Sequence, residues 1–148
     1  MKFKTATAHF DADTVKGTVR FISNNHDSVA LEVDLQGLGK QAGQFHIHTF
    51  PVAKTVIAHP QKLSSTHCSN GDVAGHFSYK DANGQGVYAG ELQLDYGMVL
   101  LNKDSVQSGF KQKPPSKFAN GLTGGIKLSG PNSIIGRSIL IHKKDGSR

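Results

Sequence analysis

The chain has no tryptophan, a single cysteine and no apolar run near the roughly 18 residues that a membrane helix needs. A lone cysteine excludes a disulfide framework within the chain, so Cys68 is a free thiol or pairs with a cysteine outside it. The first five residues also lack the apolar segment of a signal peptide. With only 36% hydrophobic residues and no heptads, the sequence favours a loop-rich sheet protein over a helical bundle or coiled coil.

The net positive charge and the distribution of the lysines indicate what kind of partner the protein binds. The 148 residues suit one domain, residues 1–148, with a net charge of +6. The lysines are dispersed, and the densest group lies in a stretch rich in proline and glycine at residues 103–117. Nucleic-acid binding is disfavoured because it wants a clustered basic face or stacking aromatics. A mild positive field that attracts a small anion fits better.

Apolar and polar residues alternate through the first third of the chain. Residues 3–9, 15–22 and 29–36 show the period of two that is typical of half-buried strands. Further strands are expected at residues 44–50, 91–94, 98–101 and 137–143, with a turn at 81–84 and long loops at 52–80 and 102–128. The pattern indicates an all-β antiparallel fold, either an immunoglobulin-like sandwich or a Greek-key barrel.

Histidines stand out as candidate metal ligands. The chain has eight, and His46 and His48 lie two apart on an expected strand, on one face and about 7 Å apart at the backbone. Such a pair suits one metal ion, or it marks a polar outward face. Surface positions are expected for the histidines that lack ligand-like spacing: His9, His26, His59 and His67.

Three motifs occur in an order that resembles a known family. They are residues 45–48 (Phe-His-Ile-His), 75–77 (Gly-His-Phe) and 134–138 (Ile-Ile-Gly-Arg-Ser), the last leading to His142. Together they are similar to the copper/zinc superoxide dismutase family, across nearly the whole chain. The resemblance implies an eight-stranded Greek-key β-barrel with four copper ligands, at His46, His48, His76 and His142. Neutral imidazoles suit both oxidation states of copper.

The sequence departs from the zinc-containing members of that family. In those members the counterpart of His76 bridges to zinc, and two further histidines and an aspartate complete the zinc site. Here no histidine lies between His76 and His142, and Tyr88 and Glu91 stand where a zinc histidine and the aspartate would be. One histidine, one tyrosine and one glutamate make a poor tetrahedral zinc site, so zinc is expected to be absent. We expect Glu91 instead to orient the distal nitrogen of His76.

The C-terminal residues also follow the resemblance in part. Ser147-Arg148 matches the family's Ser-Arg motif, which makes Arg148 the candidate that guides superoxide to the copper. The family's disulfide at the position of Cys68 implies an extracellular or cell-surface protein. The cysteine that would pair with Cys68 is absent from this chain. The copper-only branch of the family includes extracellular fungal enzymes and repeat proteins, so neighbouring repeat domains in a longer native chain are expected partners.

The expected function is therefore copper-dependent dismutation of superoxide to oxygen and hydrogen peroxide at a site without zinc. The alternative is a non-enzymatic copper-binding or structural repeat module that retains the barrel. Three glycines that flank the candidate ligands, at positions 43, 75 and 136, are expected to permit close backbone approach beside the metal.

Overall fold

The computed structural model describes residues 4–11, 15–24, 28–38, 42–52, 69–92, 96, 125–143 and 145–147. These residues form strands β1 (Lys4–Asp11), β2 (Lys16–Asn24), β3 (Ser28–Gln36), β4 (Ala42–His48), β5 (Tyr79–Lys80), β6 (Gly86–Val87) and β7 (Ser138–Lys143). One short helix, α2 (Asn70–Val73), follows β4 in the chain. Within the described residues, no helix is long and apolar enough to cross a membrane.

The first three strands form an antiparallel sheet in the order β1-β2-β3. Alternation sets its faces: Val19 on β2 pairs with Val33 on β3, and neither is exposed, whereas the intervening Arg20 pairs with Glu32 across the outer face. The three strands predicted from alternation are therefore confirmed, with ends that differ by at most two residues.

A second layer pairs β4 with β7 in antiparallel fashion. Phe45 and Ile47 point from β4 into the space between the layers, where they are 3% and 1% exposed. The predicted strand at 44–50 ends earlier than expected, at His48, because the Thr49 amide donates to Gly75 O (3.1 Å) and leaves the β7 ladder. The last strand starts at Ser138, one residue later than predicted.

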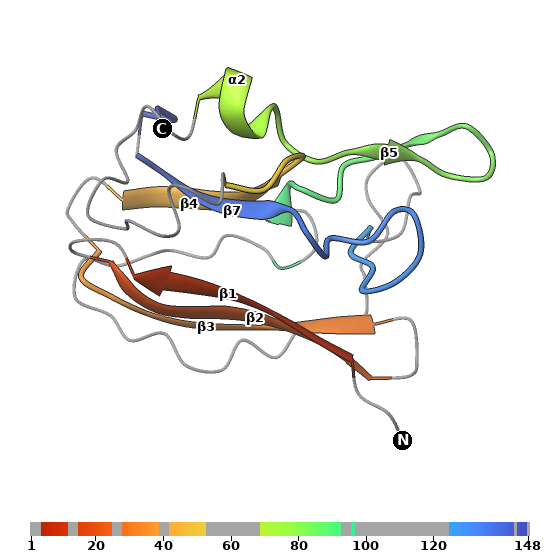
Figure 1. Ribbon diagram of the computed structural model, residues 1–148. Coiled ribbons are helices and arrows are strands. Elements are labelled where there is room, and N and C mark those ends of the chain that lie inside the picture. Colours follow the sequence, from red (N-terminus) through yellow and green to blue (C-terminus); the bar gives the residue numbers. More distant parts are fainter. Residues whose placement is uncertain are drawn as a thin grey trace.

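The core lies between these two layers (Figure 1). It is made of apolar residues from β1–β3, from β4 and from the segments that follow, including Phe21, Leu31, Leu35, Phe45, Ile47, Phe77, Leu92 and Ile134. The helix α2 lies on the side of the β4–β7 layer away from the three-stranded sheet (Figure 1). The all-β antiparallel class is confirmed, while the number of eight strands and the closure of a barrel stay predictions.

The segment between β4 and β7 in the chain contains one confirmed turn and one wrong prediction. The Asp81 carboxylate accepts from the amides of Asn83 (2.8 Å) and Gln85 (2.9 Å), which closes the β5–β6 hairpin. The strand predicted at 91–94 is wrong at its start, because Leu92 is helical and its amide donates to Gly90 O (3.1 Å). The strand predicted at 98–101 lies outside the described residues.

Candidate metal centre

Three of the four candidate ligands share the outer face of the β4–β7 layer. Since Phe45 and Ile47 face the core, alternation turns His46 and His48 outward. In the ladder His46 pairs with Leu140, so His142, two residues further along β7, lies on the same face. This outer face is nevertheless covered, because His46, His48 and His142 are only 7%, 0% and 5% exposed.

The fourth histidine comes from the loop that follows α2. His76 forms an isolated antiparallel bridge with His48. Its two neighbours are held by backbone hydrogen bonds, from Thr49 N to Gly75 O (3.1 Å) and from Phe77 N to Ile47 O (2.8 Å). The loop is therefore paired to β4 like a short extra strand, which brings the His76 ring against the rings on the sheet.

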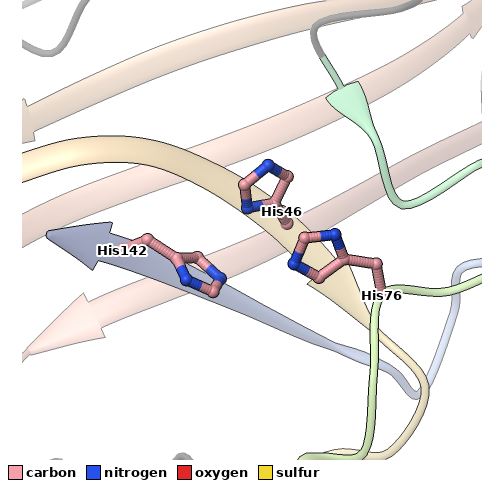
Figure 2. A group of neighbouring side chains, drawn as sticks. All are labelled: His46, His76 and His142. Atoms are coloured by element: carbon pink, nitrogen blue, oxygen red, sulfur yellow. The ribbon is translucent and has the colours of Figure 1, made fainter. Parts of the chain in front are cut away.

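The imidazoles converge on one point. Figure 2 shows His46 and His142 projecting from β4 and β7, with His76 approaching from the loop. One nitrogen of each of these three rings lies within 4.8 Å of the others. The rings of His46 and His76 stack with centroids 4.0 Å apart, and the ring of His142 meets that of His46 edge-on at 4.7 Å. The structure thus brings together residues that lie far apart in the chain, from His46 to His142.

Hydrogen bonds assign the tautomers of His48 and His142. The Nδ1 atom of His48 lies 2.9 Å from Ala74 O, and that of His142 lies 3.1 Å from Gly146 O. A carbonyl only accepts, so both Nδ1 atoms carry the proton and both Nε2 atoms present lone pairs. These two Nε2 atoms are 3.1 Å apart. Two lone pairs at this distance repel each other unless a cation, either a proton or a metal ion, is shared between them.

His46 offers its other nitrogen. Its Nε2 atom lies 3.5 Å from Glu91 Oε2, which favours a proton on Nε2. Its Nδ1 atom is buried and has no hydrogen-bond partner in the part of the chain that the structure describes. Burial, followed by the neighbouring His76, lowers the pKa of His46 to about 4, so the ring is neutral at pH 7. A buried, neutral and unpartnered imidazole nitrogen fits a metal ligand.

Glu91 fixes the orientation of His76. Its carboxylate oxygen Oε1 accepts a hydrogen bond from His76 Nδ1, which leaves Nε2 of that ring facing the cluster. Four nitrogens are then available, one Nδ1 from His46 and Nε2 from each of His48, His76 and His142. An all-imidazole set of this kind suits copper and other borderline metals.

Gly90 places Glu91, and sequence reasoning missed it. Its carbonyl accepts from Ile47 N (3.1 Å) and its amide donates to Phe77 O (2.7 Å), so it lies between two segments of the site. A Cβ atom at this position would be 2.3 Å from Ile47 O and 2.5 Å from Phe77 N. No side chain fits there, and nothing in a single sequence distinguishes this glycine from one in an ordinary turn.

Two of the glycines predicted to lie close beside the metal have open space around them in the protein. A Cβ atom at Gly75 would meet nothing within 4 Å, and the same holds at Gly136. Gly136 is needed for another reason, because its φ of 79° lies in the left-handed region that glycine favours. No protein atom crowds either position, and the expected close approach beside the metal stays a prediction.

The remaining candidates are only partly described. Arg148 and Cys68, along with His59 and His67, lie outside the described residues. His9 is exposed on β1, as predicted. Tyr88 is 54% exposed. In the described ranges, one group of three or more potential ligands gathers closely enough to hold a metal ion: His46, His76 and His142.

The fold and the four-histidine cluster define a member of a metalloenzyme family. The sequence model for copper/zinc superoxide dismutase (SODC) matches residues 15–147, so the chain belongs to that family. Family membership indicates superoxide dismutation with copper as its activity. No curated protein sequence matches the chain significantly.

Solved structures of a fungal relative support the fold. Superoxide dismutase 5 of Candida albicans superposes with TM-scores of 0.64 for a Glu-to-Gln variant, 0.62 for an Asp-to-Asn variant and 0.57 for the Cu(II) form. Sequence identity is 21–22%, and the matches cover 97–100% of this chain and 85–88% of the relative. At this identity the likeness establishes the shared architecture alone.

Proposed function

We propose that this chain is a copper-only superoxide dismutase, with one copper ion held by His46, His48, His76 and His142 and no zinc. The observation that carries the proposal is the hydrogen bond from His76 Nδ1 to the Glu91 carboxylate. In zinc-containing members of the family, the second nitrogen of this histidine bridges to zinc. Here that nitrogen is already bound to a carboxylate, which supports a site that needs no second metal.

Each side chain has a defined task in this proposal. Copper, when bound, supplies the one-electron couple that oxidises one superoxide to oxygen and reduces another, with protons, to hydrogen peroxide. The carbonyls of Ala74 and Gly146 hold Nδ1 of His48 and His142 protonated, so that Nε2 of each ring is kept as the ligand atom. Burial keeps His46 in the neutral form that a ligand requires.

His76 is suited to move a proton. Its side chain is 32% exposed, compared with 9% for His46, so its ring is the more accessible of the two to water. With Nδ1 held by Glu91, Nε2 is the ring atom that could hold either copper or a proton, so it could pass a proton from water to the product only while it is not a ligand. Glu91 holds Nδ1 throughout, which preserves the position and tautomer of the ring.

Substrate attraction is assigned to the positive charge of the chain. Superoxide is a small anion, and a net charge of +6 favours its approach. Arg148 is proposed to guide it at the site, on the strength of the family's Ser-Arg motif. The family resemblance also supports an extracellular or cell-surface protein, with a disulfide at Cys68 to a cysteine outside this chain and neighbouring repeat domains as partners.

Metal content and superoxide consumption test the proposal together. The protein is dialysed against equimolar copper and zinc, then against buffer, and its metals are counted by mass spectrometry. We expect one copper and no zinc per chain, and superoxide consumption far above that of the metal-free protein. One stoichiometric zinc would contradict the copper-only assignment. Copper binding without superoxide consumption would favour the alternative, a passive copper-binding or structural module.

A further inference from the structure

Arg137 joins three segments of the protein immediately before β7. Its Nε atom donates to Ser133 O (2.9 Å), in the turn that precedes β7, and its Nη1 atom donates to Thr49 O (2.9 Å), at the end of β4. Its guanidinium carbon lies 3.5 Å from the centroid of the Phe77 ring. One side chain thus ties a turn, a strand end and the residue after His76 to one another.

The charge of Arg137 is satisfied without a carboxylate. Within the described residues, none of the ion pairs includes this guanidinium. Its partners are two carbonyl oxygens and an aromatic face, which together suit the planar, forked donor geometry of arginine. A surface arginine has no need of such partners, so the arrangement indicates a side chain that holds its neighbours in place.

Two of the segments that Arg137 contacts are those that hold His76. The amide and the hydroxyl of Thr49 both donate to Gly75 O, at 3.1 and 3.3 Å. On the other side of His76, the Phe77 amide donates to Ile47 O (2.8 Å). Arg137 therefore holds Thr49, which binds Gly75, and it also covers the ring of Phe77. Both neighbours of His76 thus depend on Arg137.

We propose that Arg137 is a positioning residue for His76, and this inference rests on the proposed role of His76 as a copper ligand. His46, His48 and His142 lie on paired strands, which fix their backbones. His76 lies outside these strands, on a loop held to β4 by a single bridge and by the hydrogen bonds of its two neighbours. Its ring is therefore the one of the four whose placement needs support from outside the strands, and Arg137 provides that support.

The test compares Arg137→Met, Arg137→Lys and a matched control, Arg20→Met. Arg20 is an arginine on the outer face of β2, where it pairs with Glu32. Removing an outer partner of a metal ligand typically lowers metal affinity 10–100-fold. We expect Arg137→Met to weaken Cu(II) binding by roughly 10-fold. Arg137→Lys should lose less, and Arg20→Met should match the wild type. Affinity is measured by competition with a chelator of known strength.

A second background separates positioning from general stability. In a His76→Ala protein there is no ring left to position, so Arg137→Met should cause no further loss of Cu(II) affinity. An equal loss in both backgrounds, or no loss in the wild-type background, would overturn the proposal. Should Arg137→Met fail to fold, the same comparison is made with Arg137→Lys, whose single ammonium cannot reproduce the forked contact.

A metal-free readout keeps this inference distinct from the proposed function. NMR signals of the His76 ring are recorded in the metal-free wild type and in the Arg137 variants. We expect the His76 signals to shift or broaden, with those of His9, which is exposed on β1, unchanged. If the wild type binds no copper, the proposed function fails, yet these signals still decide whether Arg137 positions the ring. Unchanged His76 signals would overturn the positioning role.

Discussion

Glu91 and His76 are joined at the Nδ1 atom of the imidazole, so the Nε2 atom of His76 is the one that faces the other rings. The second carboxylate oxygen of Glu91 lies 3.5 Å from Nε2 of His46. One carboxylate therefore touches two candidate ligands and sets the tautomer of both. Because opposite nitrogens of the two rings are engaged, their remaining nitrogens, Nε2 of His76 and Nδ1 of His46, are left for the metal.

Substitution of Glu91 tests this orienting role. We expect Glu91→Ala and Glu91→Gln to keep the fold and to lower superoxide consumption by roughly 10–100-fold, because the rings lose the acceptor that fixes them. The alanine variant should consume superoxide more slowly than the glutamine variant, since glutamine still offers one oxygen acceptor. Glu32→Ala, on the outer face of β3, serves as the control. A Glu91→Ala protein as active as the wild type across neutral pH would show that another group orients His76.

Loss of a ligand should have a larger effect than loss of its orienting partner. His46→Ala and His48→Ala each remove a nitrogen from the cluster, so we expect copper affinity to fall by orders of magnitude in both. His9→Ala is the matched control, because His9 is exposed on β1. Isothermal titration with copper measures the three variants side by side. Similar affinities in all of them would place the copper site elsewhere in the chain.

Alternation explains how much of the fold could be predicted. Along β3, Val29, Leu31, Val33 and Leu35 are buried and the residues between them are not, so the period of two in the sequence matches the burial in the sheet. The same rule failed at Glu91 and Leu92, the start of the alternating run Glu-Leu-Gln-Leu. There Leu92 reaches the core by a turn after Gly90. A strand and such a turn can both bury this leucine, so the alternation does not distinguish them.

Part of the candidate site could likewise be predicted from the sequence and part could not. Proximity of His46 and His48 follows from their spacing on one strand, whereas His76 and His142 were joined to them only through a family resemblance. The structure now brings all four rings together. The role of Gly90 could not be predicted, because it depends on the distance between segments that are remote in sequence.

Acid should destabilise the metal-free protein through His46. Its pKa is about 4 in the folded protein and 6.5 in a free chain, so between these values the unfolded chain binds more protons. Stability is therefore full above about pH 6.5 and falls as pH drops toward 4. Denaturant unfolding at several pH values, with a chelator present, measures this slope.

Two variants identify the group responsible. His46→Gln removes the titrating ring and should flatten the slope between pH 6.5 and pH 4, whereas His9→Gln should leave it as in the wild type. A slope that persists unchanged in His46→Gln would assign the acid sensitivity to other groups in the protein.

Close packing around Gly90 gives a final prediction, for Gly90→Ala. The added methyl group would meet two backbone atoms, Ile47 O at 2.3 Å and Phe77 N at 2.5 Å, so β4 and the segment after β6 must move apart. Overpacking of this kind typically costs about 1–3 kcal/mol. Since Glu91 follows directly, its carboxylate should also move from His76, and we expect copper affinity to fall together with stability. Gly75→Ala is the matched control, because its methyl group would enter open space beside the same histidine. Thermal unfolding and copper titration compare the two alanine variants. Equal stability and equal copper affinity in both would contradict this account, since only Gly90 is crowded by the backbone.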